Sequence, residues 1–90
     1  MPKDHVGRFA DQVAKGFAAV GCRIPVARDG ETVVSRDIFA EFGPGISLFK
    51  ASEPDAPFMS FPEGAGDSAA TAFCMHILAG VVARAVEATE

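Results

Sequence analysis

Residues 69–86 are the most apolar stretch of the chain, and their pattern predicts a buried helix. Fourteen of these eighteen residues are apolar, and Asp67 or Ser68 can cap the first turn. A helix that is apolar around nearly its whole circumference must be covered on most sides. A membrane span needs about 20 mostly apolar residues. Since His76 and Arg84 interrupt this run, we expect a helix of the protein core and no membrane contact.

A second, amphipathic helix is predicted over residues 4–20. Bulky apolar residues recur there at helical spacing, at Val6, Phe9, Val13, Phe17 and Val20. Small residues form a neighbouring stripe, at Gly7, Ala10, Ala14, Ala18 and Gly21. We expect the bulky stripe to face a sheet and the small stripe to let the other helix approach closely.

Alternating apolar and polar positions predict four strands between the two helices. Their ranges are 22–28, 31–42, 46–51 and 58–61. Asp29-Gly30 predicts a tight hairpin turn, because glycine tolerates a positive φ. The second strand is long, so we expect a kink, a bulge or a short helical turn near Arg36-Asp37.

The resulting element order is α-β-β-β-β-α, in a single domain over residues 1–90. Short connections favour an antiparallel β-meander, with the N-terminal and C-terminal helices on one face. The predicted fold class is therefore α+β, a two-layer sandwich around one core.

Composition and charge narrow the possible environments and partners. The 90-residue chain is 49% hydrophobic and 22% charged, which indicates a globular protein, and its formal net charge is −4. Direct nucleic-acid binding needs a basic face, and the sequence offers none, so we expect no direct nucleic-acid contact. With no apparent export signal and only Cys22 and Cys74, a reducing cytoplasm is the expected location.

The sequence contains no convincing catalytic or metal-binding constellation, and we expect neither an enzyme nor a cofactor. The candidate soft metal ligands are His5, Cys22, Cys74 and His76. Cys74 and His76 are two residues apart on a helix, so they project about 200° from each other. His76 instead shares a narrow polar stripe with Gly80, Arg84 and Glu87, which we expect to meet water or a partner.

The apolar surface of the last helix suggests a protein-interaction module. One sheet and one helix cover about two of its sides, so Val81, Val82, Ala85 or Val86 should remain exposed in a monomer. Contiguous exposed apolar surface usually marks an interface. The partner would be another protein, for which the chain acts as an adaptor or inhibitor, or a second copy of the chain in a dimer.

Acidic loops before the last helix offer a second means of recognition. Residues 51–83 carry Glu53, Asp55, Glu63 and Asp67 but no Lys or Arg. These carboxylates would steer the encounter with a basic surface of a partner protein.

A ligand-binding module, or an accessory subunit of an enzyme, is the alternative. Its pocket would lie between sheet and helices and be lined by phenylalanines, namely Phe42, Phe49, Phe58, Phe61 and Phe73. The competing interpretation is that these rings simply fill the core.

Overall fold

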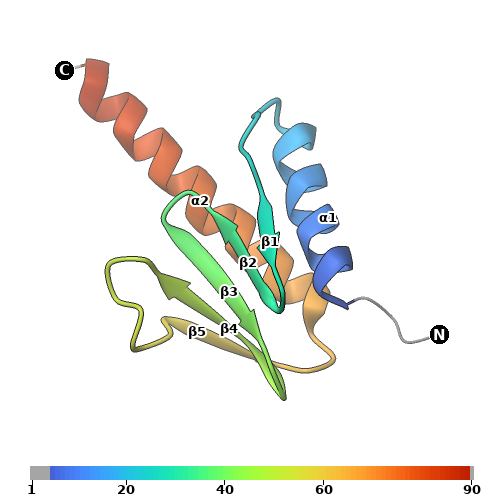
Figure 1. The fold of residues 1–90 in the computed structure, drawn as a ribbon. Coiled ribbons are helices and arrows are strands. Elements are labelled where there is room, and N and C mark those ends of the chain that lie inside the picture. The colour runs from blue at the N-terminus through green and yellow to red at the C-terminus, as the bar shows by residue number, and fades with distance from the viewer. Residues whose placement is uncertain (1–4, 90) are drawn as a thin grey trace.

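The computed structural model describes the backbone of residues 5–89 and the side chains of residues 5–84. Two helices pack side by side on one face of a five-stranded sheet (Figure 1). The elements are α1 (His5–Ala19), β1 (Ala27–Asp29), β2 (Thr32–Ser35), β3 (Ile38–Phe42), β4 (Gly45–Lys50), β5 (Met59–Pro62) and α2 (Gly66–Thr89). The sheet is an antiparallel meander in the order β1-β2-β3-β4-β5, which confirms the predicted α+β class with one strand more than expected.

The extra strand arises at Arg36-Asp37, where the chain reverses instead of merely kinking. Ser35 pairs with Ile38 on either side of this two-residue turn. Arg36 adopts a φ of 53°, a left-handed conformation that is uncommon for a residue other than glycine. The predicted turn after Asp29 is present, and Gly30 has a φ of 63° there.

The predicted first strand is shorter than expected, because only Ala27–Asp29 pairs with β2. The preceding residues still alternate as expected, since Cys22, Ile24 and Val26 pack partly buried against the core. Buried Ser35 holds this segment against β2 by donating a hydrogen bond from Oγ to the Pro25 carbonyl at 2.8 Å.

One face of the sheet is covered by both helices and forms the core. Val33, Ala40 and Leu48 are in register across β2, β3 and β4, and all three are fully buried. Phe9 of α1 makes edge-to-face contacts with Phe42 and Phe73, with ring centroids 5.1 and 5.6 Å apart. Such contacts between aromatic rings contribute about 0.5–1.5 kcal/mol each beyond their buried area.

The two helices approach each other at Gly16 rather than along the predicted stripe of small residues. A Cβ atom at Gly16 would lie 2.9 Å from Cys74 Sγ, so a larger residue there would require the thiol to move. Cys74 Sγ also donates to the Val13 carbonyl at 3.5 Å. Ala14 and Ala18 of the predicted stripe are exposed. The bulky residues of α1 face the core and Gly16 faces α2, and this rotation of the helix leaves Ala14 and Ala18 in solvent.

Two glycines of the β3–β4 hairpin should differ in how well they tolerate an added methyl group. A Cβ at Gly45 would lie 2.7 Å from the Phe61 carbonyl oxygen of the paired strand, whereas a Cβ at Gly43 would meet open space. We expect Gly45→Ala to lower the free energy of unfolding by about 1–3 kcal/mol and Gly43→Ala to change it by less than about 0.5 kcal/mol. Urea denaturation measures both; equal stabilities would contradict the close β4–β5 packing.

Candidate interaction surface

Helix α2 is longer than the sheet that it covers. Its 24 residues span about 36 Å at about 1.5 Å per residue. The longest strand, β4, has six residues and spans about 20 Å. The helix therefore extends past the sheet, and Figure 1 shows its C-terminal end standing away from the other elements.

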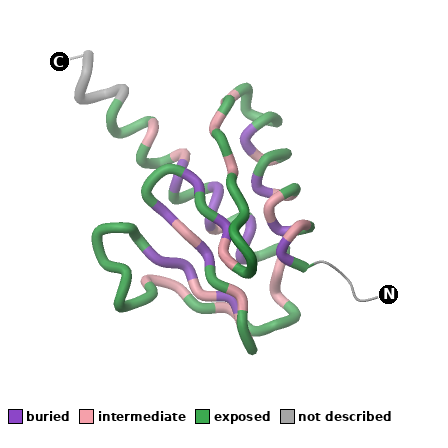
Figure 2. The backbone as a smooth tube through the Cα atoms, viewed as in Figure 1, coloured by how far each residue is buried: buried purple, intermediate pink, exposed green. Residues whose placement is uncertain are grey.

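Among the described side chains of α2, the buried ones lie in its first half. They are Ala69, Ala70, Phe73, Cys74 and Ile77. Beyond Ile77, none of the described side chains of the helix is fully buried, and Figure 2 shows the change from buried to exposed positions along the helix.

The solvent-facing side of α2 changes from polar to apolar along its length. It begins with Ser68 and Thr71, which are exposed and polar. Further along the same side, Met75 is 64% exposed, Val82 is 61% exposed, and Ala79 between them is also exposed. We call Met75, Ala79 and Val82 the distal stripe. Spacings of four and three residues place them on one side of the helix.

The structure places the predicted apolar interface residues differently from one another. Val82 belongs to the distal stripe, while Val81 is partly buried. The side chains of Ala85 and Val86 lie outside the described residues. Met75 and Ala79 were missed from the sequence, although their spacing to Val82 was a readable signal.

The predicted polar stripe is occupied in part by a contact within the protein. The His76 ring packs against Phe58 in an edge-to-face arrangement, with centroids 4.7 Å apart. Lys50 Nζ lies 5.7 Å from the centroid of the same Phe58 ring. Arg84 is exposed, and the side chain of Glu87 lies outside the described residues.

The four predicted acidic residues are exposed but belong to two separate segments. Glu53 and Asp55 lie in the loop between β4 and β5, while Glu63 and Asp67 follow β5. Strand β5 separates the two pairs. The Asp67 carboxylate accepts a hydrogen bond from Gln12 Nε2 and lies 3.9 Å from Arg8 Nη2, so it also links α2 to α1.

The predicted phenylalanine residues do not line one common pocket. Phe73 is fully buried beside Phe9. Phe49 stacks on Phe39 on the face of the sheet away from the helices, with centroids 4.9 Å apart and planes 6° apart. Phe58 faces His76 instead. Of the five rings, only Phe42 lines the open pocket of about 300 Å³ at the N-terminal end of α1.

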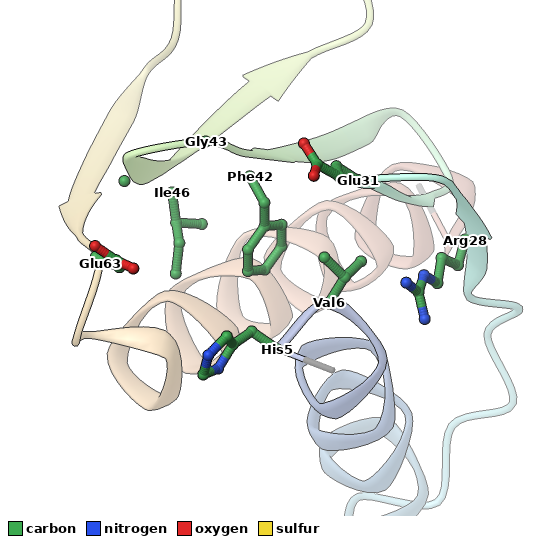
Figure 3. Close-up of a pocket in the computed structure, with 9 residues that line it drawn as sticks. His5, Val6, Arg28, Glu31, Phe42, Gly43, Ile46 and Glu63 are labelled. Atoms are coloured by element: carbon green, nitrogen blue, oxygen red, sulfur yellow. The ribbon is translucent and has the colours of Figure 1, made fainter. Parts of the chain in front are cut away.

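This open pocket lies where the N-terminal end of α1 meets the ends of several strands (Figure 3). Its residues are His5, Val6, Arg28, Glu31, Phe42, Gly43, Gly45, Ile46 and Glu63. The apolar side chains of Val6, Phe42 and Ile46 lie between charged groups of both signs. Arg28 Nε already donates to the Gly30 carbonyl at 3.1 Å. The arrangement is a mixed-charge hollow without a defined ligand geometry.

The candidate metal ligands are dispersed. Cys74 is buried between α1 and α2, Cys22 is partly buried after α1, and His5 lines the pocket at the start of α1. Among the described residues, no three His, Cys, Asp or Glu side chains come together in a way that could hold a metal ion.

One segment of α2, Gly66–Arg84, is long and apolar enough to cross a membrane by length and composition alone, and 22% of it is buried in the fold. Phe73 and Ile77 within that segment are core residues. Inserting the segment into a bilayer would therefore remove side chains on which the fold depends.

Comparisons with known protein families, curated proteins and solved structures found no match.

The two cysteines should differ in reactivity. Burial raises the pKa of the Cys74 thiol, which lowers the thiolate fraction at pH 8, and thiolate is the reactive form. Cys22 is the more exposed of the two. We expect iodoacetamide to modify Cys22 at least about tenfold faster in the native protein, with the difference disappearing in denaturant. Timed alkylation with mass spectrometry measures this; equal native rates would contradict the buried position of Cys74.

Proposed function

We propose that this chain is a small non-catalytic protein-interaction module that binds through the distal part of α2. The observation that carries this proposal is the exposure of Met75 and Val82 on one side of a helix that extends past its own sheet. Apolar side chains aligned on one helix face are the usual means by which a helix docks on another protein. The partner is either a larger protein or a second copy of the chain.

The distal stripe alone is too small to provide the free energy that a stable complex needs. Fully burying a Val or Met side chain contributes about 1.5–3 kcal/mol, so Met75 and Val82 together contribute only about 2–4 kcal/mol on binding. A stable complex costs several kcal/mol in lost translational and rotational freedom. The partner must therefore also contact neighbouring residues, including Ala79 and the partly buried Leu78 and Val81.

A contact with a membrane surface is supported less well than a contact with protein. The distal stripe consists of Met, Ala and Val without Trp or Phe, and the chain carries a net charge of −4. Helices that lie on membranes typically combine large apolar residues with Lys and Arg. The alternative of a phenylalanine-lined ligand pocket also has less support, because the five phenylalanines are dispersed.

Substitutions on the distal stripe should abolish binding to a partner without unfolding the chain. Ala79→Glu places a charge on the stripe, while Ala14→Glu makes the same change at an exposed position of α1. Ala14 is two residues from Gly16, so it projects about 200° away from the contact with α2. We expect the native chain and Ala14→Glu to capture the same partner from a native cell extract, and Ala79→Glu to lose at least about tenfold of it.

Quantitative mass spectrometry of the captured proteins, with circular dichroism as the folding control, measures the outcome. Vesicles of phosphatidylcholine and phosphatidylglycerol serve as a parallel probe. Equal capture by all three proteins, or stripe-dependent binding to vesicles alone, would contradict the proposed function.

Charge steering through the acidic loops forms a separate part of the proposal. Since the acids form two pairs separated by β5, the pairs are reversed separately, as Glu53→Lys with Asp55→Lys and as Glu63→Lys with Asp67→Lys. If the captured partner is basic, at least one double variant should associate about tenfold more slowly at low salt, with a flatter salt dependence. Surface plasmon resonance measures these rates. Unchanged association rates for both variants would remove charge steering and leave the apolar contact.

A further inference from the structure

We infer that Met75 is a site of reversible oxidation, where a hydroperoxide converts the thioether to a sulfoxide and thereby weakens binding through the distal stripe. This inference rests on the proposed function and adds a means of regulating that same surface. It is carried by the positions of the sulfur atoms in the fold, because the one on the binding surface is exposed and the other described ones lie against or within the core.

Met75 is the sulfur-containing side chain that the fold leaves open to solvent. Four such side chains lie in the described part of the chain, and Met75 is 64% exposed. Cys22 and Met59 are partly buried and pack against the core, and Cys74 is a core residue. The remaining methionine, Met1, lies outside the described residues. A dissolved oxidant therefore reaches Met75 more readily than the other three described sulfur atoms.

The reaction is the transfer of one oxygen atom. The Met75 sulfur attacks the terminal oxygen of the hydroperoxide with its lone pair, so that an S–O bond forms and the O–O bond breaks. The sulfur loses two electrons to the peroxide. The leaving oxygen takes up the hydroperoxide proton and departs as an alcohol, or as water when the oxidant is hydrogen peroxide. Methionine sulfoxide reductases reverse the change.

Cys74 is a poor competitor for the oxidant, although it is the next residue in the chain. Its thiol lies against Gly16 and donates to the Val13 carbonyl. Burial also raises the pKa of this thiol, which lowers the fraction of the reactive thiolate. The competing thiol that remains is Cys22, so an experiment on Met75 requires Cys22→Ser.

Oxidation of Met75 changes the binding surface directly. A sulfoxide oxygen is polar and accepts hydrogen bonds, whereas the thioether that it replaces is apolar. Water satisfies this oxygen in the free chain. A partner that covers the distal stripe buries it beside Ala79 and Val82, whose side chains carry no hydrogen-bond donor. A buried acceptor without a donor weakens binding, here by about tenfold or more.

Met59 shows why the position of Met75 matters for the fold. Met59 pairs with the fully buried Leu48 of β4, and its side chain packs against the core. An oxygen atom added there would enter apolar surroundings and destabilise the protein. Met75 lies outside the core, so its oxidation alters the surface while the folded state persists.

Peroxide treatment of the native chain tests the selectivity. In a Cys22→Ser background, hydrogen peroxide should oxidise Met75 at least about fivefold faster than Met59, and the difference should disappear in urea. Tandem mass spectrometry assigns the added oxygen to each methionine. Equal rates in the native chain would overturn the inference.

Binding by the oxidised chain tests the consequence. The probe is the protein that the native chain captures from a cell extract, eluted and purified. Oxidation of the Cys22→Ser chain, followed by removal of the peroxide, should raise the dissociation constant at least about tenfold without changing the circular dichroism. Treatment with methionine sulfoxide reductase should restore the original value.

Two leucine variants in the same background assign the effect to one sulfur atom. Met75→Leu keeps an apolar side chain of similar volume, and its own dissociation constant should be the same before and after peroxide. Met59→Leu is the matched control and should still lose affinity when it is oxidised. An equal loss of affinity in oxidised Met75→Leu would place the sensitive site elsewhere and overturn the inference.

The inference and the proposed function fail in different ways. Binding that survives oxidation of Met75 but is lost in Ala79→Glu overturns the oxidation site and leaves the interaction module intact. Binding that neither oxidation nor Ala79→Glu changes, or the capture of no protein at all, overturns both.

Discussion

The exposed apolar surface of α2 depends on one constraint, which is the difference in length between this helix and the sheet. A helix of 24 residues lies on strands of three to six residues, so only its first half meets the sheet. That half contributes Phe73 and Ile77 to the core. Among the described side chains of the second half, Ala79 and Val82 are apolar and exposed, and Leu78 and Val81 are only partly buried. This combination distinguishes α2 from an ordinary core helix.

The packing of the first half determines where the second half stands. Phe73 meets Phe9 edge to face, and the Cys74 thiol lies directly against Gly16, where a Cβ atom would come within 2.9 Å of Sγ. At the start of α2, the Asp67 carboxylate accepts a hydrogen bond from Gln12 Nε2. These contacts hold α2 against α1 along its first three turns, and a surface held in place before binding loses less conformational entropy when a partner docks.

Much of the fold was readable from the sequence, because hydrophobic spacing and the Asp-Gly turn depend on neighbouring residues. An interruption near Arg36-Asp37 was also predicted, but the reversal of the chain there was not, since Arg-Asp has no strong turn preference and the positive φ is imposed by strand pairing. The contact at Gly16 was missed for a similar reason. The predicted stripe of small residues and Gly16 could each have let α2 approach α1 closely, and only tertiary packing selects between them. At the surface, excess apolar circumference indicated Val82, whereas the exposure of Met75 depends on which side of α2 the sheet and α1 cover.

The central claim is that the second half of α2 is poorly covered within one subunit. Hydrogen–deuterium exchange of the backbone amides in the purified chain, with and without the protein captured from the cell extract, tests this most directly. The account predicts fast exchange of residues 78–89 in the free chain while residues 69–77 stay protected, and protection of residues 78–89 that increases about tenfold or more when the captured protein binds. Strong protection of residues 78–89 in the free chain, or no gain on binding, would contradict it.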